Sequence, residues 1–87
     1  MAKYNIQIKP SAIKELDKLP KKDLQKIVVK IQSLSTLPRP PGCEKLSGDE
    51  KYRIRHGNYR IVYSIEDNNL IIVVVKVGHR RDIYKKQ

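Results

Sequence analysis

YRIRHGNYRIVY, residues 52–63, is the stretch of this sequence that decides the fold. Two alternating runs meet at Gly-Asn, positions 57–58, a dipeptide that accepts the positive φ angles of a two-residue hairpin turn. The pattern predicts two antiparallel strands in which Arg55 lies opposite Arg60. Side chains alternate across a strand, so Arg53 joins these two arginines on one face. The other face would hold tyrosines and isoleucines: Tyr52, Ile54, Tyr59, Ile61, Tyr63 and Ile65.

The pairing of Arg55 with Arg60 bears on function, because folding alone gives no reason for it. Like charges directly opposite each other destabilise a sheet by roughly 0.2–1 kcal/mol. An anion bound between the two guanidinium groups would provide the reason. The alternative is that the arginines only solvate the open face of a half-buried sheet.

The composition limits both the size and the partners of the protein. Eighty-seven residues predict a single domain over residues 1–87, and with no Trp and no Phe its core must be aliphatic with some tyrosine. A large internal substrate cavity is not expected. The net charge of +10 points to polyanions, with nucleic acid ahead of an acidic protein or an anionic membrane.

The location follows from what the chain lacks. The single cysteine, Cys43, has no partner for an internal disulfide, which fits a reducing compartment. Residues 1–9 contain no apolar leader, and the apolar run at 70–75 is too short to span a bilayer. We therefore expect a cytoplasmic protein without a membrane partner.

The remaining elements follow from periodicity and from breaker residues. A strand is predicted at 4–9, a short helix opening at Pro10-Ser11 and marked by Ile13, Leu16 and Leu19, and a second helix at 21–34. Residues 36–42, rich in proline, form a loop. A short edge strand is expected within 45–48 and the last strand within 70–77.

These elements predict a two-layer α+β fold of the order β-α-α-β-β-β. A helical hairpin would cover the Tyr/Ile face of an antiparallel sheet, with the first strand beside the last. A three-residue loop at 67–69 would set Lys76 beside Arg60, on the basic face. That face would stay open.

The sequence does not favour metal or cofactor chemistry. Its acidic residues are not spaced with histidine as metal ligands usually are, and no glycine-rich phosphate loop is present. RNA cleavage needs neither, because the 2′-OH of RNA attacks the adjacent phosphorus once the two are held in line, and arginines stabilise the extra negative charge. A proton acceptor is also required. Tyr84 and His79 are the candidates, and Arg80 and Arg81 would lower the pKa of the Tyr84 phenol.

Four motifs follow one another in the second half of the chain: KLSG at 45–48, YRIR at 52–55, GNYRIVY at 57–63 and VGHRRDIY at 77–84. In this order they resemble the RelE branch of the RelE/ParE toxins of bacterial and archaeal type II toxin–antitoxin systems. The resemblance covers essentially the whole chain. It implies an mRNA interferase, a metal-independent endoribonuclease that cleaves messenger RNA in the ribosomal A site and inhibits translation, and it implies a cognate antitoxin that neutralises it.

The resemblance also implies residue roles. Arg60 would stabilise the phosphorane, Arg80 the charge on the phosphate or leaving group, and Tyr84 would orient or activate the 2′-OH. Arg53 and Arg55 replace lysines of some family members, one of which has been assigned base character, and arginine does not readily accept a proton. RNA phosphates would be bound by Lys45, Arg53, Arg55, Lys76 and Arg81.

Two rival functions remain open. A ParE-like toxin on the same scaffold would bind and poison DNA gyrase without cutting RNA, although a binder needs no set such as Arg60, Arg80 and Tyr84. A plain basic RNA-binding module would leave RNA intact, and its affinity would fall steeply with salt.

Overall fold

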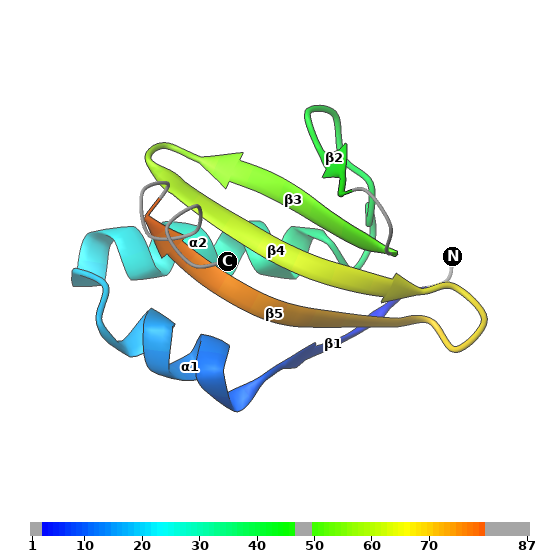
Figure 1. The fold of residues 1–87 in the computed structure, drawn as a ribbon, viewed down its shortest axis with the longest axis horizontal. Coiled ribbons are helices and arrows are strands. Elements are labelled where there is room, and N and C mark those ends of the chain that lie inside the picture. Colours follow the sequence, from blue (N-terminus) through cyan, green and yellow to red (C-terminus); the bar gives the residue numbers. More distant parts are fainter. Residues whose placement is uncertain (1–2, 47–49, 80–87) are drawn as a thin grey trace.

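A computed structural model of the chain describes residues 3–46 and 50–79. The strands of its sheet lie in the order β1-β5-β4-β3-β2, with β1 parallel to β5 and every other pair antiparallel (Figure 1). The predicted helical pair after the first strand and the contact between the first and last strands are confirmed. The sheet is mixed instead of antiparallel, and four strands follow the helices instead of the three in the predicted order, because the short edge strand counts as one of them. The elements are β1 (Asn5–Ile8), α1 (Pro10–Asp17), α2 (Lys21–Ser33), β2 (Glu44–Lys45), β3 (Lys51–His56), β4 (Tyr59–Glu66) and β5 (Ile71–His79).

The hairpin of β3 and β4 has the predicted register. Ile54 pairs with Ile61, and Arg55 pairs with Arg60. Gly57 has a φ of +60°, whereas Asn58 does not have a positive φ, which is the pattern of a type II′ turn. The predicted Tyr/Ile face is confirmed as well, since its members are buried or pack against the buried core.

The register between β4 and β5 differs from the predicted one. The turn has four residues, 67–70, and Leu70 adopts a left-handed φ of 56°. A bulge then shifts the register between Val62 and Tyr63, so that Lys76 pairs with Val62. The predicted pairing of Lys76 with Arg60 is therefore wrong. Lys76 nevertheless lies on the predicted face, the one that carries Arg60. The four-residue turn alone would place Lys76 opposite Ile61 on the core side, and the bulge shifts the register by one more residue and returns Lys76 to the basic side.

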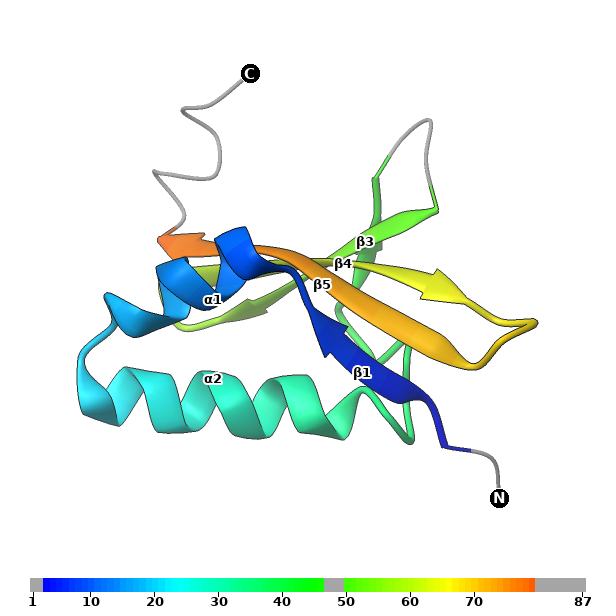
Figure 2. The ribbon, with the colours of Figure 1, turned by 90° about the horizontal axis from the view of Figure 1, so that it is seen from below.

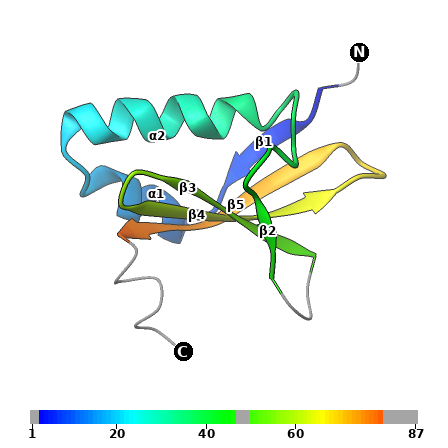
Figure 3. The same ribbon diagram turned by 90° about the horizontal axis from the view of Figure 1, so that it is seen from above.

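The two helices occupy different places around the sheet. Figures 2 and 3 show α2 against one face of the sheet, below it in Figure 2 and above it in Figure 3, whereas α1 lies beside β5 at the edge that β1 leaves uncovered. The expectation that both helices cover one face thus holds for α2 alone. Of the residues predicted to mark this helix, Leu16 is buried, whereas Ile13 is 45% exposed and Ala12 is buried in its place. On α2, Ile27 and Ile31 are buried, four residues apart on one face of the helix.

A polar network fixes the proline-rich loop at the end of the sheet remote from the Gly57 turn. Arg39 pairs with Asp67, with 2.9 Å between Nη2 and Oδ2, and Asp67 also accepts a hydrogen bond from the Tyr4 hydroxyl at 2.6 Å. The Nε of Arg39 donates to the hydroxyl of Tyr52 at 3.1 Å. The loop therefore ties α2 to β3 and to the β4–β5 turn.

Candidate nucleic-acid interface

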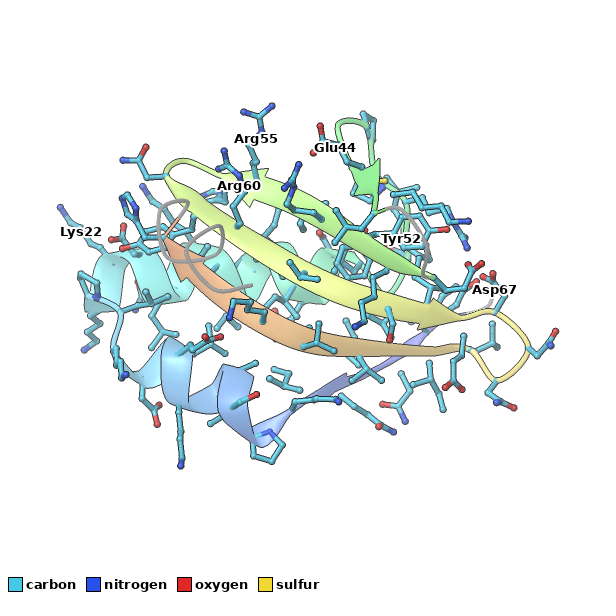
Figure 4. All side chains as sticks on the ribbon, viewed as in Figure 1. Lys22, Glu44, Tyr52, Arg55, Arg60 and Asp67 are labelled. Carbon is cyan, nitrogen blue, oxygen red and sulfur yellow. The ribbon has the colours of Figure 1, made fainter. Side chains whose placement is uncertain are left out.

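Three strands present basic side chains on the side of the sheet away from α2. We call this surface the arginine face; its members are Arg53 and Arg55 of β3, Arg60 of β4 and Lys76 of β5. It is the side that faces the viewer in Figure 1, where α2 lies behind the sheet. Figure 4 shows Arg55 and Arg60 side by side near the β3–β4 turn. The hairpin register therefore brings two of the predicted phosphate-binding side chains, Arg53 and Arg55, onto the same face as Arg60, the predicted phosphorane-stabilising residue.

Arg60 is the one buried charged residue in the described part of the chain, with 6% of its surface exposed. Its Nε has no hydrogen-bond partner among the described residues, and its Nη1 makes a long contact of 3.5 Å with the Tyr59 carbonyl. Val62, 7% exposed, is the next residue of β4 on the same face. A buried charge without a carboxylate is costly to a folded protein. The site thus holds a guanidinium group in place at a cost that an anion would offset.

Glu44 of β2 brings a carboxylate to the same surface. It pairs with Arg53 in the β2–β3 register, and its Oε1 accepts hydrogen bonds from both Nε and Nη2 of that arginine. The hydrogen bond and charge of Arg53, with smaller effects from the charges of Arg55 and Arg60, lower the pKa of Glu44. Its side chain remains 52% exposed.

Sequence reasoning missed Glu44. The residue stands next to Lys45 in a two-residue strand, and its pairing with Arg53 depends on the register of that short edge strand. No periodicity marks an element of this length. The only signal was an acidic residue directly before a motif that was read for its lysine.

The two predicted lysines are both engaged with carboxylates. Lys45 is the register partner of Tyr52, so its side chain points to the side of the sheet opposite the arginine face. Its Nζ lies 3.5 Å from Oε2 of Glu50. Lys76 lies on the arginine face, and its Nζ is 3.9 Å from Glu15 of α1. Of the two, Lys76 is the one that the structure brings to the arginines.

His79 lies on the other side of the sheet. It pairs with Tyr59, and the two rings meet edge to face with centroids 5.9 Å apart. The Tyr59 hydroxyl donates to Asp23 of α2 at 3.0 Å, and this bond raises the pKa of the phenol. Tyr59 packs against the core, whereas its neighbour Arg60 faces outward. His79 is therefore not directed toward the arginine face.

The predicted residues Arg80, Arg81 and Tyr84 lie outside the described residues. Gly78, two positions before Arg80, is the register partner of Arg60. The chain thus leaves β5 beside the buried arginine.

Residues 3–46 and 50–79 hold no group of three or more His, Cys, Asp or Glu residues that would bind a metal ion. None of the helices in this part of the chain has the length and apolar character needed to cross a membrane.

Comparison with known proteins agrees with this geometry. The family model described as "ParE toxin of type II toxin-antitoxin system, parDE" matches residues 6–84. The putative toxin RelE1 of Methanocaldococcus jannaschii is 34% identical over 95% of this chain and 97% of its own length, and the toxin RelG of Mycobacterium tuberculosis is 32% identical over 95% and 98%.

A solved structure supports the same relationship. The RelBE2 toxin–antitoxin complex of Mycobacterium tuberculosis contains a chain that superposes with a TM-score of 0.82 at 29% identity, covering 92% of this chain and 94% of that chain. The family match spans both the helices and the sheet. The chain therefore belongs to the RelE/ParE superfamily of type II toxin–antitoxin toxins, and its relatives named here are RelE-family proteins.

Proposed function

We propose that this toxin is a ribosome-dependent endoribonuclease that cleaves mRNA in the A site without a metal ion. The observation that supports this most is Arg60, a buried guanidinium beside Arg55 whose Nε has no partner within residues 3–46 and 50–79. Such a group is preorganised for the negative charge that develops on a phosphorane. The similarity to RelE toxins and the net charge of +10 support the same substrate class.

The reaction uses the nucleophile of the substrate. The 2′-oxygen attacks the adjacent phosphorus, the bond from phosphorus to the 5′-oxygen breaks, and the products are a 2′,3′-cyclic phosphate and a 5′-OH. The proton of the 2′-OH passes to a base, and the leaving 5′-oxygen receives a proton from an acid or from water. Arg60 and Arg80 stabilise the phosphorane, and Tyr84 orients the 2′-OH.

The remaining cations bind neighbouring phosphates. Arg53, Arg55 and Lys76 of the arginine face do so beside Arg60, and Arg81 extends the contacts along the RNA. Lys45 has the parity of the opposite face and is left out of this surface. We further propose that a cognate antitoxin neutralises the toxin, as the M. tuberculosis relative was crystallised as a toxin–antitoxin complex.

The test is cleavage of mRNA on programmed ribosomes, with the 5′ ends of the fragments mapped. We expect cuts in the A-site codon for the wild type, and a loss of about 100-fold or more in Arg60→Ala, Arg80→Ala and Tyr84→Phe. Lys22→Ala is the matched control, because Lys22 is an exposed cation of α2 far from the arginine face (Figure 4). The control should cut like the wild type, and intact mRNA with the wild-type toxin would refute the proposal.

A second function has one observation in its favour, which is the match to a family described by the name ParE. A toxin that acts on DNA gyrase by binding would leave mRNA intact. It would produce gyrase-linked DNA breaks instead. Assaying both activities on the same preparation distinguishes the two functions.

A further inference from the structure

The proposed cleavage needs a proton acceptor at the arginine face, and arginine is not one because its pKa exceeds about 12. His79 lies on the opposite side of the sheet, against Tyr59. Glu44 is a carboxylate in direct contact with the arginine face, and about half of its side chain remains open to solvent. It therefore has the chemistry and the access that the arginines and His79 lack.

We propose that Glu44 is the general base that takes the proton from the 2′-OH of the RNA. This inference rests on the proposed ribonuclease function and adds a residue to it. Arg53 acts as a positioning residue, because its Nε and Nη2 both donate to the Oε1 of Glu44 and leave Oε2 to the substrate. Glu44 shares the side of the sheet on which Arg53 lies, because the two are register partners, and Figure 4 shows it at β2, beyond the edge of β3.

The geometry suits a ribose and its phosphate lying across the sheet. Glu44, Arg53 and Val62 occupy neighbouring positions of β2, β3 and β4, while Arg55 and Arg60 form the next pair toward the turn. Neighbouring strands lie about 4.8 Å apart and residues rise about 3.4 Å along a strand, so the backbones of Glu44 and Arg60 are separated by two strand spacings across the sheet and by two residues along it.

The proton balance of the step is complete. Glu44 accepts the 2′-OH proton as the 2′-oxygen bonds to phosphorus, and the bond to the 5′-oxygen breaks. The leaving oxygen takes a proton from an acid of the chain or from water, and Glu44 later releases its proton to solvent. The arginines also keep Glu44 ionised before the reaction, since they lower its pKa.

The experiment compares single-turnover cleavage on programmed ribosomes, at saturating toxin, for the wild type, Glu44→Gln and Glu50→Gln. Glu50 is the matched control: it is an exposed carboxylate close in the chain that pairs with Lys45 instead of the arginine face. We expect Glu44→Gln to slow cleavage by about 100-fold or more while ribosome binding is unchanged or tighter. Glu50→Gln should cleave like the wild type.

A pH profile separates a base from a residue that only shapes the site. With Glu44 as the base, the wild-type rate is flat between pH 6 and 9, because the carboxylate is already ionised throughout this range. A phenol acting as the base would give a rate that rises about tenfold per pH unit over the same range.

Each outcome is decisive. A Glu44→Gln toxin that cuts as fast as the wild type, or faster, overturns the role of Glu44; the faster rate would identify the carboxylate as a competitor of the RNA phosphate. A wild-type rate that rises through pH 9 also overturns it. Wild-type toxin that leaves the mRNA intact refutes the proposed function itself, so the two failures are distinguishable.

Discussion

At the scale of single residues, Arg60 lies in surroundings that disfavour a charged group. Its guanidinium is buried beside another arginine, and its Nε is unpaired within the described part of the chain. Selection for stability alone would remove such a group, because a buried charge without a partner costs free energy. The arrangement is explained if Arg60 binds an anion that a substrate supplies.

Replacing Arg60 should therefore increase stability while it abolishes activity. We expect Arg60→Met to raise the free energy of unfolding by about 1 kcal/mol or more, because the flexible apolar side chain fills the site without a charge. Urea denaturation measures this as a higher midpoint at unchanged slope. Arg55→Met, at the exposed partner position, should change stability by less than about 0.5 kcal/mol. A clear loss of stability in Arg60→Met would show that the arginine is structural.

The pKa of Asp67 gives a prediction about acid stability. Hydrogen bonds from Arg39 and, less strongly, from Tyr4 lower the pKa of this carboxyl in the folded chain. The resulting stabilisation is present above the ordinary aspartate value of about 3.9 and is lost as the pH falls through the lower folded value. At pH 6 the wild type should melt at a higher temperature than Asp67→Asn. Thermal melts from pH 6 to pH 2 should show this difference shrinking below about pH 4; a constant difference would contradict the account.

At the scale of elements, α1 completes the edge of the sheet where β1 ends. β1 pairs with β5 only as far as Val74, and beyond it the Val77 N–H donates to the Oε1 of Glu15 at 2.8 Å. The same carboxylate approaches Lys76. A helix side chain thus replaces a strand and satisfies a backbone donor just before the chain reaches Arg80.

Removing this carboxylate should destabilise the protein. We expect Glu15→Ala to cost about 1–3 kcal/mol, because the part-buried Val77 N–H loses its acceptor. Glu15→Gln keeps an amide oxygen in place and should cost clearly less. Urea denaturation gives the free energies, and hydrogen exchange at the Val77 amide reports the local effect. Equal stability of the two variants, or unchanged exchange in Glu15→Ala, would exclude this role.

The elements also show which parts of the structure the sequence determines locally. The β3–β4 hairpin was predicted residue by residue, because its turn and its alternation lie within one short stretch. The β4–β5 register was not predicted correctly, because it depends on a four-residue turn and on a bulge. Each shifts the register by one residue, and together they leave each side chain beyond the bulge on the face that was predicted. Glu44 was missed for a similar reason, since a two-residue edge strand has no pattern of its own. Ile13 was misplaced because α1 packs at the edge of the sheet instead of on its face.

At the scale of the whole molecule, the sheet divides the chain into two sides with separate tasks. One side is apolar and packs against α2, and the other presents Arg53, Arg55, Arg60 and Lys76. With a net charge of +10, the open side is suited to a phosphate backbone. The part of the candidate site that lies on the β3–β4 hairpin, Arg53, Arg55 and Arg60, could be predicted from the sequence.

The affinity for RNA should depend steeply on salt. Four phosphate contacts by the cations of the arginine face, at a slope of about −0.7 each for single strands, predict a loss of about 50-fold between 50 and 200 mM salt. Arg55→Ala should reduce the slope of log K against log salt by about 0.7. Fluorescence anisotropy with a single-stranded RNA measures both, and a slope unchanged by Arg55→Ala would remove that residue from the interface.

The most direct test of the central claim, that a buried arginine stabilises attack by the RNA on itself, is to delete the nucleophile. An mRNA with a single 2′-deoxynucleotide on the 5′ side of the mapped cut is placed on programmed ribosomes with wild-type toxin. We predict no cleavage at that bond, while the all-ribose mRNA yields a 2′,3′-cyclic phosphate and a 5′-OH in the presence of EDTA. Cleavage of the deoxy-substituted bond at the normal rate would contradict the account.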